Sequence, residues 1–143
     1  MWRHIRRTVA APALSLSLPR PLLETRQAVG LLTKLRFVDN CESAKRATKT
    51  DQPYCIKLPR DKKVAKFGEV ITIAHRGKVH KALIVGSRKP GSKRLPCYDT
   101  HHIVMLNEKL EPVGTRIVAP IPSELRRKSG QWSKVIALAT KFI

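Results

Sequence analysis

A cysteine followed by two adjacent histidines is the arrangement in this sequence that comes nearest to a metal site. Cys97, His101 and His102 form a C-x3-H-H pattern, and thiolate and imidazole are both zinc ligands. A structural zinc site needs four ligands, usually supplied as two close pairs. Cys41 and Cys55 are distant in the sequence, so the spacing provides no second pair. We therefore predict no metal site, and a metal or redox protein built on these residues is the rival hypothesis.

Asp99, beside the two histidines, raises the question of acid–base or nucleophilic catalysis. Catalysis of that kind needs a histidine, an acid and a nucleophile held in mutual orientation. Asp39, Cys41 and Ser43 have suitable side chains, but nothing in the sequence fixes their geometry. Aspartate is also common in turns, where its side chain bonds the nearby backbone. The sequence predicts a protein that is not an enzyme and that has no cofactor.

The segment VGSRKPGSKR, residues 85–94, contains the glycines and cations of a phosphate-binding loop. It lacks the G-x-x-x-x-G-K-[ST] order of a nucleotide P-loop, and the chain contains no G-x-G-x-x-G pattern. A flexible basic loop of this kind can adapt to a nucleic-acid backbone, and a solvated charged turn has the same composition. This loop alone does not decide between the two.

Positive charge is the dominant feature of the composition. The 143 residues include 29 Lys and Arg against 10 Asp and Glu, a formal net charge of +19. Residues 31–143 hold 24 of the basic and nine of the acidic residues, so the excess does not come from one tail. A folded domain must keep this charge on its surface, because unpaired buried charge is too costly. The partner is therefore expected to be polyanionic, and nucleic acid is the first candidate.

The basic residues gather in clusters on segments that are predicted to be loops or hairpin turns. Several basic loops on a rigid body suit contact with phosphates over a wide surface. Aromatic residues are few and isolated, which disfavours a dedicated single-strand binder and favours recognition of folded RNA by shape and backbone. The predicted RNA-binding residues are Lys45, Arg46, Lys49, Arg60, Lys62, Lys63, Arg76, Lys78, Arg88, Lys89, Lys93, Arg94, Arg126, Arg127 and Lys128.

Short apolar runs separated by glycine, proline and basic residues predict the element order. Strands are expected over residues 32–38, 54–58, 69–75, 78–86, 102–107 and 115–120. Arg76-Gly77 suits a two-residue hairpin turn between the third and fourth of these. Short strands with turns between them favour a sandwich or barrel, and a closed barrel removes exposed edges. The fold class is therefore mainly β, in one domain.

The C-terminal part of the sequence changes from strand patterns to helix patterns. One helix is expected to begin near Pro122 and to end at Gly130. A second is expected in QWSKVIALATKFI, where one side carries the apolar residues Trp132, Val135, Ile136 and Ala139. These two short helices would pack on or beside the barrel.

The first thirty residues differ from the rest of the chain. They contain five Arg, no Lys and a single acid, Glu24, and Ser and Thr are frequent. This composition is typical of a mitochondrial transit peptide, and a disordered RNA-binding tail is the alternative. We predict an extension over residues 1–30 and a folded domain over residues 31–143. No apolar run reaches the ~18 residues of a membrane span.

Residues 98–126 and 132–143 resemble the C-terminal half of the universal large-subunit ribosomal protein family numbered fourteen. The pattern is a strand ending in Asn, a Pro-x-Gly-Thr-Arg-Ile turn, a proline, Glu-Leu-Arg and a Lys-containing last helix. The matching residues are Pro112, Gly114, Thr115, Arg116, Ile117, Pro120, Glu124, Leu125, Arg126, Lys134, Leu138 and Ala139. Residues 38–40 and 81–85 match upstream. Cys41-Glu42-Ser43 replaces the bacterial Ser-Gly-Ala, and with the N-terminal extension this departure indicates a mitochondrial member.

The resemblance implies a small five-stranded β-barrel with short C-terminal α-helices, bound to large-subunit rRNA in the mitochondrial matrix. It also implies intersubunit bridges to the small subunit, a neighbouring large-subunit protein of the family numbered nineteen, and a docking site for a ribosome-silencing factor. In this family that docking site maps onto Thr115, Arg116 and Lys134. A mitochondrial nucleic-acid-binding regulator outside the ribosome is the alternative function.

The turn that contains Thr115 and Arg116 has two interpretations from its residues alone. Gly114 is expected to allow a tight turn, because glycine tolerates positive φ, and that turn would present both side chains outward. Arg116 could then bind a phosphate or a partner carboxylate through its forked guanidinium. The alternative is that Arg116 pairs with an acid of this chain such as Glu124.

Overall fold

The structure, a computed structural model, describes residues 29–88, 98–127 and 129–143. The predicted transit peptide therefore lies almost entirely outside the described residues. Cys97 also lies outside the described residues, as do four of the predicted RNA-binding residues, Lys89, Lys93, Arg94 and Lys128.

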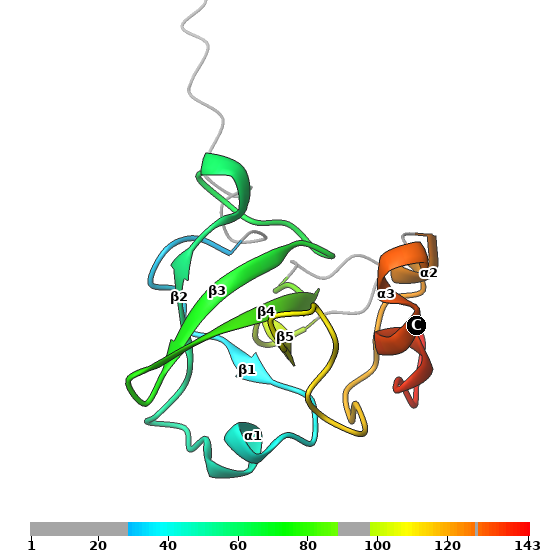
Figure 1. The fold of residues 1–143 in the computed structure, drawn as a ribbon, viewed down its shortest axis with the longest axis horizontal. Coiled ribbons are helices and arrows are strands. Elements are labelled where there is room, and N and C mark those ends of the chain that lie inside the picture. Colours follow the sequence, from blue (N-terminus) through cyan, green and yellow to red (C-terminus); the bar gives the residue numbers. More distant parts are fainter. Residues whose placement is uncertain (1–28, 89–97, 128) are drawn as a thin grey trace, which may run out of the picture.

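Five strands form one curled sheet in the order β1-β5-β4-β3-β2 (Figure 1). The strands are β1 (Arg36–Phe37), β2 (Tyr54–Lys57), β3 (Val70–His75), β4 (Lys78–Gly86) and β5 (His102–Leu106). Neighbouring strands are antiparallel except β1 and β5, which are parallel. Each of the five strands thus lies within a segment where the sequence predicted a strand.

The extended segment 33–38 joins the two ends of this sheet. The Leu35 amide donates to the Pro53 carbonyl at 2.8 Å, next to β2. The amide of the following residue, Arg36, donates to the His101 carbonyl at 2.9 Å, next to β5. Adjacent residues of a strand present their amides to opposite sides, so one strand can pair with both edges. The sheet thereby closes on itself, and the predicted five-stranded barrel is confirmed.

The β3–β4 connection is the two-residue hairpin turn that the sequence predicted. Arg76 and Gly77 both have positive φ, 51° and 72°, and His75 pairs with Lys78 across the turn. Positive φ at both central positions defines a type I′ turn, whose twist matches that of the flanking strands. Arginine is an unusual residue at the first of these positions, where Asn, Asp and Gly predominate.

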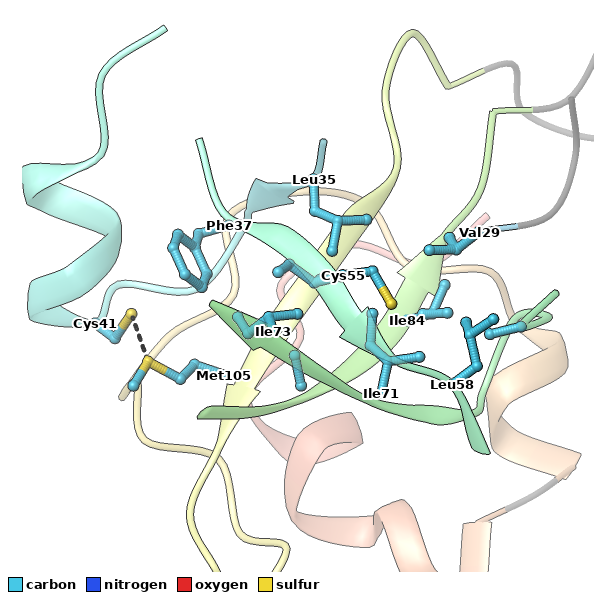
Figure 2. Close-up of a cluster of buried hydrophobic side chains, with 13 residues drawn as sticks. Val29, Leu35, Phe37, Cys41, Cys55, Leu58, Ile71, Ile73, Ile84 and Met105 are labelled. Carbon is cyan, nitrogen blue, oxygen red and sulfur yellow. Dashed lines mark hydrogen bonds between the residues drawn. The ribbon is translucent and has the colours of Figure 1, made fainter. Parts of the chain in front are cut away.

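Apolar side chains form two cores, one on each face of β4 and β5. Ile84 points into the barrel together with Leu35, Ile71 and Ile73 (Figure 2), and Ile103 belongs to the same core. The residues next to them on the same strands pack on the other side, under the C-terminal segment; these are Leu83, Val85, Val104 and Leu106. Burial on both faces explains why residues 82–86 of β4 and 103–106 of β5 are continuous apolar runs rather than alternating ones.

The C-terminal segment covers the outer core with two short helices, as predicted, although one boundary was wrong. The helices are α2 (Glu124–Arg127) and α3 (Ser129–Ala137). Gly130 lies inside α3 instead of ending the first helix. Trp132 and Val135 are buried in the outer core, and Ile136 and Ala139 are partly buried against it. The predicted apolar side of the last helix is therefore confirmed.

Residues 115–120 do not form the predicted strand. Ile117 alone makes isolated bridges, to Asp39 and Ala139. Its amide donates to the Leu138 carbonyl at 3.0 Å, and the residues on either side of it bond Val38 and Asn40. The segment therefore lies between the barrel-closing strand and the chain end without forming a regular ladder with either. Proline at 120 and 122 removes two of the donors that a regular ladder would need.

Two short helical segments were not predicted. The first is α1 (Glu42–Arg46), whose N-cap is Cys41. The Cys41 Sγ accepts from the Ala44 amide at 3.3 Å, a position where Ser, Thr, Asp or Asn is usual. The second is the 3-10 turn η2 (Pro59–Asp61), in which Arg60 has a φ of 50°. A cysteine cap gives a weak sequence signal, which explains why α1 was missed.

Gly114 is required for a close approach and not for a left-handed backbone. The described glycines with positive φ are Gly68 and Gly77, so the reason given from the sequence was wrong. A Cβ at position 114 would lie 2.9 Å from the Cβ of Asp39 and 3.2 Å from the amide nitrogen of Asn40. The 111–117 loop can therefore lie against the end of the barrel-closing strand only if residue 114 has no side chain.

Gly114→Ala is expected to destabilise the protein by about 1–3 kcal/mol, the usual cost of overpacking a tight contact. Gly130→Ala is the matched control, because a Cβ there has nothing within 4 Å. In a helix that change is expected to be neutral or stabilising by up to about 1 kcal/mol. Urea denaturation of the two variants measures the difference. Equal midpoints would show that the loop does not depend on the contact with Asp39.

Candidate RNA and partner surfaces

All of the predicted RNA-binding residues that the structure describes are exposed, and they occupy separate regions. The first region combines the α1 cluster with the β3–β4 turn. The Arg76 guanidinium donates to the Arg46 carbonyl at 2.8 Å and pairs with Asp51. Lys45, Lys49 and Lys78 are exposed in the same region. Two clusters thirty residues apart in the sequence thus form one surface.

The second region lies around η2, at the other end of the barrel from α1 (Figure 1). Arg60, Lys62 and Lys63 are exposed there. Lys62 donates to Glu69 at 2.5 Å, so part of its charge is already compensated within the chain. A separate exposed cation, Arg88, follows β4, and its amide donates to the His101 Nδ1 at 3.3 Å.

The third region is α2, where Arg126 and Arg127 are exposed. The Arg126 guanidinium lies over the Phe142 ring, 3.9 Å from its centroid. This cation–π contact attaches α2 to the C-terminal residues and leaves the guanidinium edge exposed. Arg126 therefore has a packing role that the sequence did not indicate, and Arg127 does not share it in the described contacts.

Further exposed cations on the barrel lie outside the predicted set, among them Lys34, Arg36 and Lys57. Each of these three falls within a predicted strand. Arg36 alternates with buried Leu35 and Phe37, and this period of two is the signal that places its side chain outside.

The three residues assigned to partner docking lie on adjoining segments. Thr115 and Arg116 are exposed in the loop that follows Glu111, and Glu111 pairs with Lys134 of α3. The expected alternative partner of Arg116, Glu124, is absent from its contacts: no ion pair among residues 29–88, 98–127 and 129–143 joins them. Arg116 is consequently available to an outside ligand, whereas Lys134 has an acid of this chain beside it.

Exposed valines flank Thr115 and Arg116 in the sequence. Val113 is 40% exposed and Val118 69%, so the loop presents apolar surface on both sides of Thr115 and Arg116. The backbone is fixed to the barrel, because the Asn40 amide donates to the Arg116 carbonyl and the Val118 amide to the Val38 carbonyl, each at 2.9 Å. A rigid loop with mixed apolar and cationic surface suits contact with a protein partner.

The cysteines and histidines considered for metal or redox chemistry do not form a cluster. Within the described residues no group of three or more His, Cys, Asp and Glu side chains could hold a metal ion. Cys41 and Cys55 are free and buried, and the Cys41 Sγ lies 3.8 Å from the Met105 Sδ (Figure 2). Burial, with the nearby Asp39, raises the pKa of Cys41 to about 12. The thiol is therefore protonated at neutral pH and is a weak nucleophile.

The histidines that follow Cys97 are partly buried. Burial lowers the pKa of His101, and the Arg88 charge adds to this effect. Burial and Arg36 lower the pKa of His102, which Asp99 opposes. His102 lines a cavity of about 410 Å³ between β1, α1 and residues 118–119. Both rings are therefore neutral at pH 7, as packed histidines are expected to be.

Asp39 is a buried acid at the junction of the barrel and the 111–117 loop. It is 5% exposed, and neither carboxylate oxygen has a hydrogen-bond partner within the part of the chain that the structure describes. Burial raises its pKa above the ordinary value, and the Cys41 thiol and nearby backbone groups oppose the shift only in part. The charged form of Asp39 is therefore destabilising in the folded protein.

No helix among the described residues is long and apolar enough to cross a membrane.

Comparison with known proteins gives one family and close relatives. The model of the family described as ribosomal protein L14p/L23e matches residues 28–143. The protein named large ribosomal subunit protein uL14m from Danio rerio is 35% identical over 116 residues, which cover 81% of this chain and 82% of that protein. Large ribosomal subunit protein uL14 from Neorickettsia sennetsu is 32% identical over 95 residues, covering 59% of this chain and 79% of its own.

Asp39→Asn is expected to raise the stability of the free protein at pH 7. The folded pKa of Asp39 lies above its unfolded value of about 3.8, so stability is lost as pH rises through that interval. The uncharged amide avoids the loss and remains similar in shape. Thermal melts from pH 3.5 to pH 8 measure the effect. The gain over the unchanged protein should shrink towards acid pH, and a gain that is independent of pH would contradict the account.

Proposed function

The chain belongs to the ribosomal protein L14p/L23e family, and we propose that it is a structural component of the large subunit of the mitochondrial ribosome. The observation that carries this proposal is the family match over residues 28–143, which includes every residue that the structure describes. The Danio rerio relative is a mitochondrial large ribosomal subunit protein. We propose the mitochondrial matrix as the location. The transit peptide that directs the chain there was predicted over residues 1–30, and we now place it before Val29, because Val29 is buried in the inner core and bonds Ala65.

The proposed ligand of the basic regions is large-subunit rRNA. Cations on α1, on the β3–β4 turn, around η2 and on α2 point away from the barrel in several directions. A duplex bound to one face would leave most of them unused, whereas folded RNA that surrounds the domain would use them together. The phosphates would also relieve the mutual repulsion of a domain with so few acids. The protein would act by charge neutralisation and shape, without catalysis.

The 111–117 loop and α3 form the proposed protein-facing side. Exposed Arg116 between two exposed valines, on a backbone fixed to the barrel, supports a role in contact with the small subunit or with a ribosome-silencing factor. Lys134 would take part after exchanging Glu111 for an acid of the partner. A neighbouring large-subunit protein of the family numbered nineteen is the further proposed partner.

Sucrose-gradient sedimentation of a mitochondrial lysate tests the main proposal. The protein should migrate with the large subunit and with the intact ribosome, and RNase treatment should move it to light fractions. Exclusive recovery in the light fractions of untreated lysate would reject a ribosomal role. It would favour the alternative of a nucleic-acid-binding regulator.

Arg116→Glu is expected to reduce subunit joining, or binding of a silencing factor, by about tenfold or more, because it places a like charge against an acidic partner group. Incorporation into large subunits should be unchanged. Lys141→Glu makes the same charge change at an exposed site outside the loop and serves as the control. Subunit-joining assays with purified large subunits provide the measurement. Normal joining by the Arg116 variant would remove this residue from the interface.

Arg127→Ala is expected to weaken incorporation into large subunits without changing the melting temperature. Arg126→Ala should weaken incorporation and also cost about 0.5–1 kcal/mol of stability, since its contact with Phe142 is lost. The combined change of Arg126, Arg127 and Lys128 to Ala should give the largest loss. Gradient profiles and thermal melts of all three variants separate binding from folding. Full incorporation of the triple variant would show that α2 does not contact rRNA.

A further inference from the structure

A cationic cleft lies between α1 and the β3–β4 turn, and sequence patterns gave no sign of it. The cavity has a volume of about 230 Å³ and is lined by Glu42, Ser43, Arg46, His75, Arg76, Lys78 and His80. Figure 1 shows α1 and the turn at the same end of the barrel. The lining residues come from two segments thirty residues apart, so the cleft exists only in the folded chain.

The cationic side of the cleft is held in place by contacts within the chain. The Arg76 guanidinium spans from the Arg46 carbonyl, at 2.8 Å, to the Asp51 carboxylate. These contacts use Nε and one terminal nitrogen, and N–H groups of the guanidinium remain for a ligand. Lys78 is exposed beside it. An ordered arginine loses little side-chain entropy when it binds, which makes the cleft a prepared site.

Buried His75 forms the inner part of the cleft. The side chain is 5% exposed, and its ring meets the Phe37 ring edge to face at a centroid distance of 5.3 Å. Its Nε2 has no hydrogen-bond partner among the described residues and lies 3.8 Å from the Asp51 Oδ2. A polar ring nitrogen buried without a partner is an unusual cost in a core, and it lies in the same site as the fixed arginine.

The backbone at Arg76 supports a functional reason for this arrangement. Arg76 occupies a left-handed conformation at the first position of a type I′ turn, where Asn or Gly would fit with less strain. Strained residues of this kind persist where the surrounding structure needs that side chain, and they cluster at ligand sites. Here the strain places a guanidinium at the rim of the cleft.

We infer that this cleft binds one phosphate group of an RNA backbone. Arg76 and Lys78 would bind the phosphate oxygens, and the Ser43 hydroxyl would donate a further hydrogen bond. Arg46 lines the site but pairs with Glu42, so it adds less attraction. The inference rests on the proposed function, and it deepens it by assigning a specific phosphate site to two of the basic clusters.

His80 makes binding at this site dependent on pH. In the free protein its pKa is lowered by burial first and then by His75 and Lys78. The other charged groups around the cleft are Glu42, Arg46, Arg76 and Asp51. A bound phosphate favours the protonated ring and raises the pKa, so binding takes up a proton. Affinity should therefore rise as pH falls through the bound-state pKa, and should level off below the free-state pKa.

Filter binding of the full chain to transcribed large-subunit rRNA tests the inference. The slope of log K against log salt is negative, and Lys78→Gln should reduce its magnitude by about 0.7–0.9, the loss of one phosphate contact. The affinity should fall roughly fivefold at 0.1 M salt. Lys109→Gln removes the same charge from an exposed turn outside the cleft and should retain the slope. Equal slopes for these two variants would overturn the inference.

Arg76→Asn provides a variant that is expected to fold at least as well as the unchanged protein. Asn-Gly is the preferred type I′ pair, so the melting temperature should be equal or higher while rRNA affinity falls by about tenfold. His80→Gln should remove the rise in affinity between pH 8 and pH 6. Retained affinity in the Arg76 variant, or retained pH dependence in the His80 variant, would exclude the cleft.

The rRNA affinity of the unchanged protein distinguishes a failure of this inference from a failure of the proposed function on which it rests. If it binds rRNA with high affinity and the cleft variants bind equally well, the cleft is wrong and the ribosomal role stands. If the unchanged protein does not bind rRNA at all, both are wrong.

Discussion

The closure of the barrel depends on one strand whose neighbouring amides face opposite ways. Leu35 bonds the chain next to β2, and Arg36 bonds the chain next to β5. The same strand continues into Val38 and Asn40, which hold the 111–117 loop through two further backbone hydrogen bonds. Immediately after Asn40 the chain turns into α1. The positions of the loop and of the cleft beside α1 thus follow from the pairing of residues 32–38.

Burial on both faces of β4 and β5 gives the stability that this charge distribution requires. A domain with so many more cations than acids repels itself in the free state, and the Lys and Arg ion pairs among the described residues are largely exposed and of small value. Two apolar cores that share the same strands offset this repulsion, because residues 82–86 of β4 and 103–106 of β5 are removed from water on both faces. The surface can therefore retain its cations for a polyanion without loss of the fold.

The sequence predicted the elements whose signals are local. The β3–β4 hairpin was evident from two β-branched runs joined by Arg76-Gly77, and the apolar side of α3 was evident from its spacing. The segment 115–120 has the same apolar pattern as a strand, but it makes isolated bonds to residues 38–40 and to the chain end, an arrangement that no local pattern identifies. Gly114 was singled out correctly and explained wrongly, because a close contact with Asp39 leaves no trace in the sequence.

The sequence predicted which cations would be exposed, but not how they are grouped on the surface. Charge alone required the cations to be exposed, since burial would be too costly. Their grouping depends on contacts between distant segments, such as Arg76 with Arg46 and Lys134 with Glu111. These contacts also divide the cations by role. Lys134 must give up its ion pair with Glu111 before it can pair with an acid of a partner. A specific protein partner can meet this condition, and the exchange suits reversible docking. Arg127 and Lys78 have no acid to displace among the described ion pairs, so any nearby phosphate can bind them. We therefore expect RNA to bind readily at such unpaired cations, and Lys134 to bind only a partner that supplies an acid in place of Glu111.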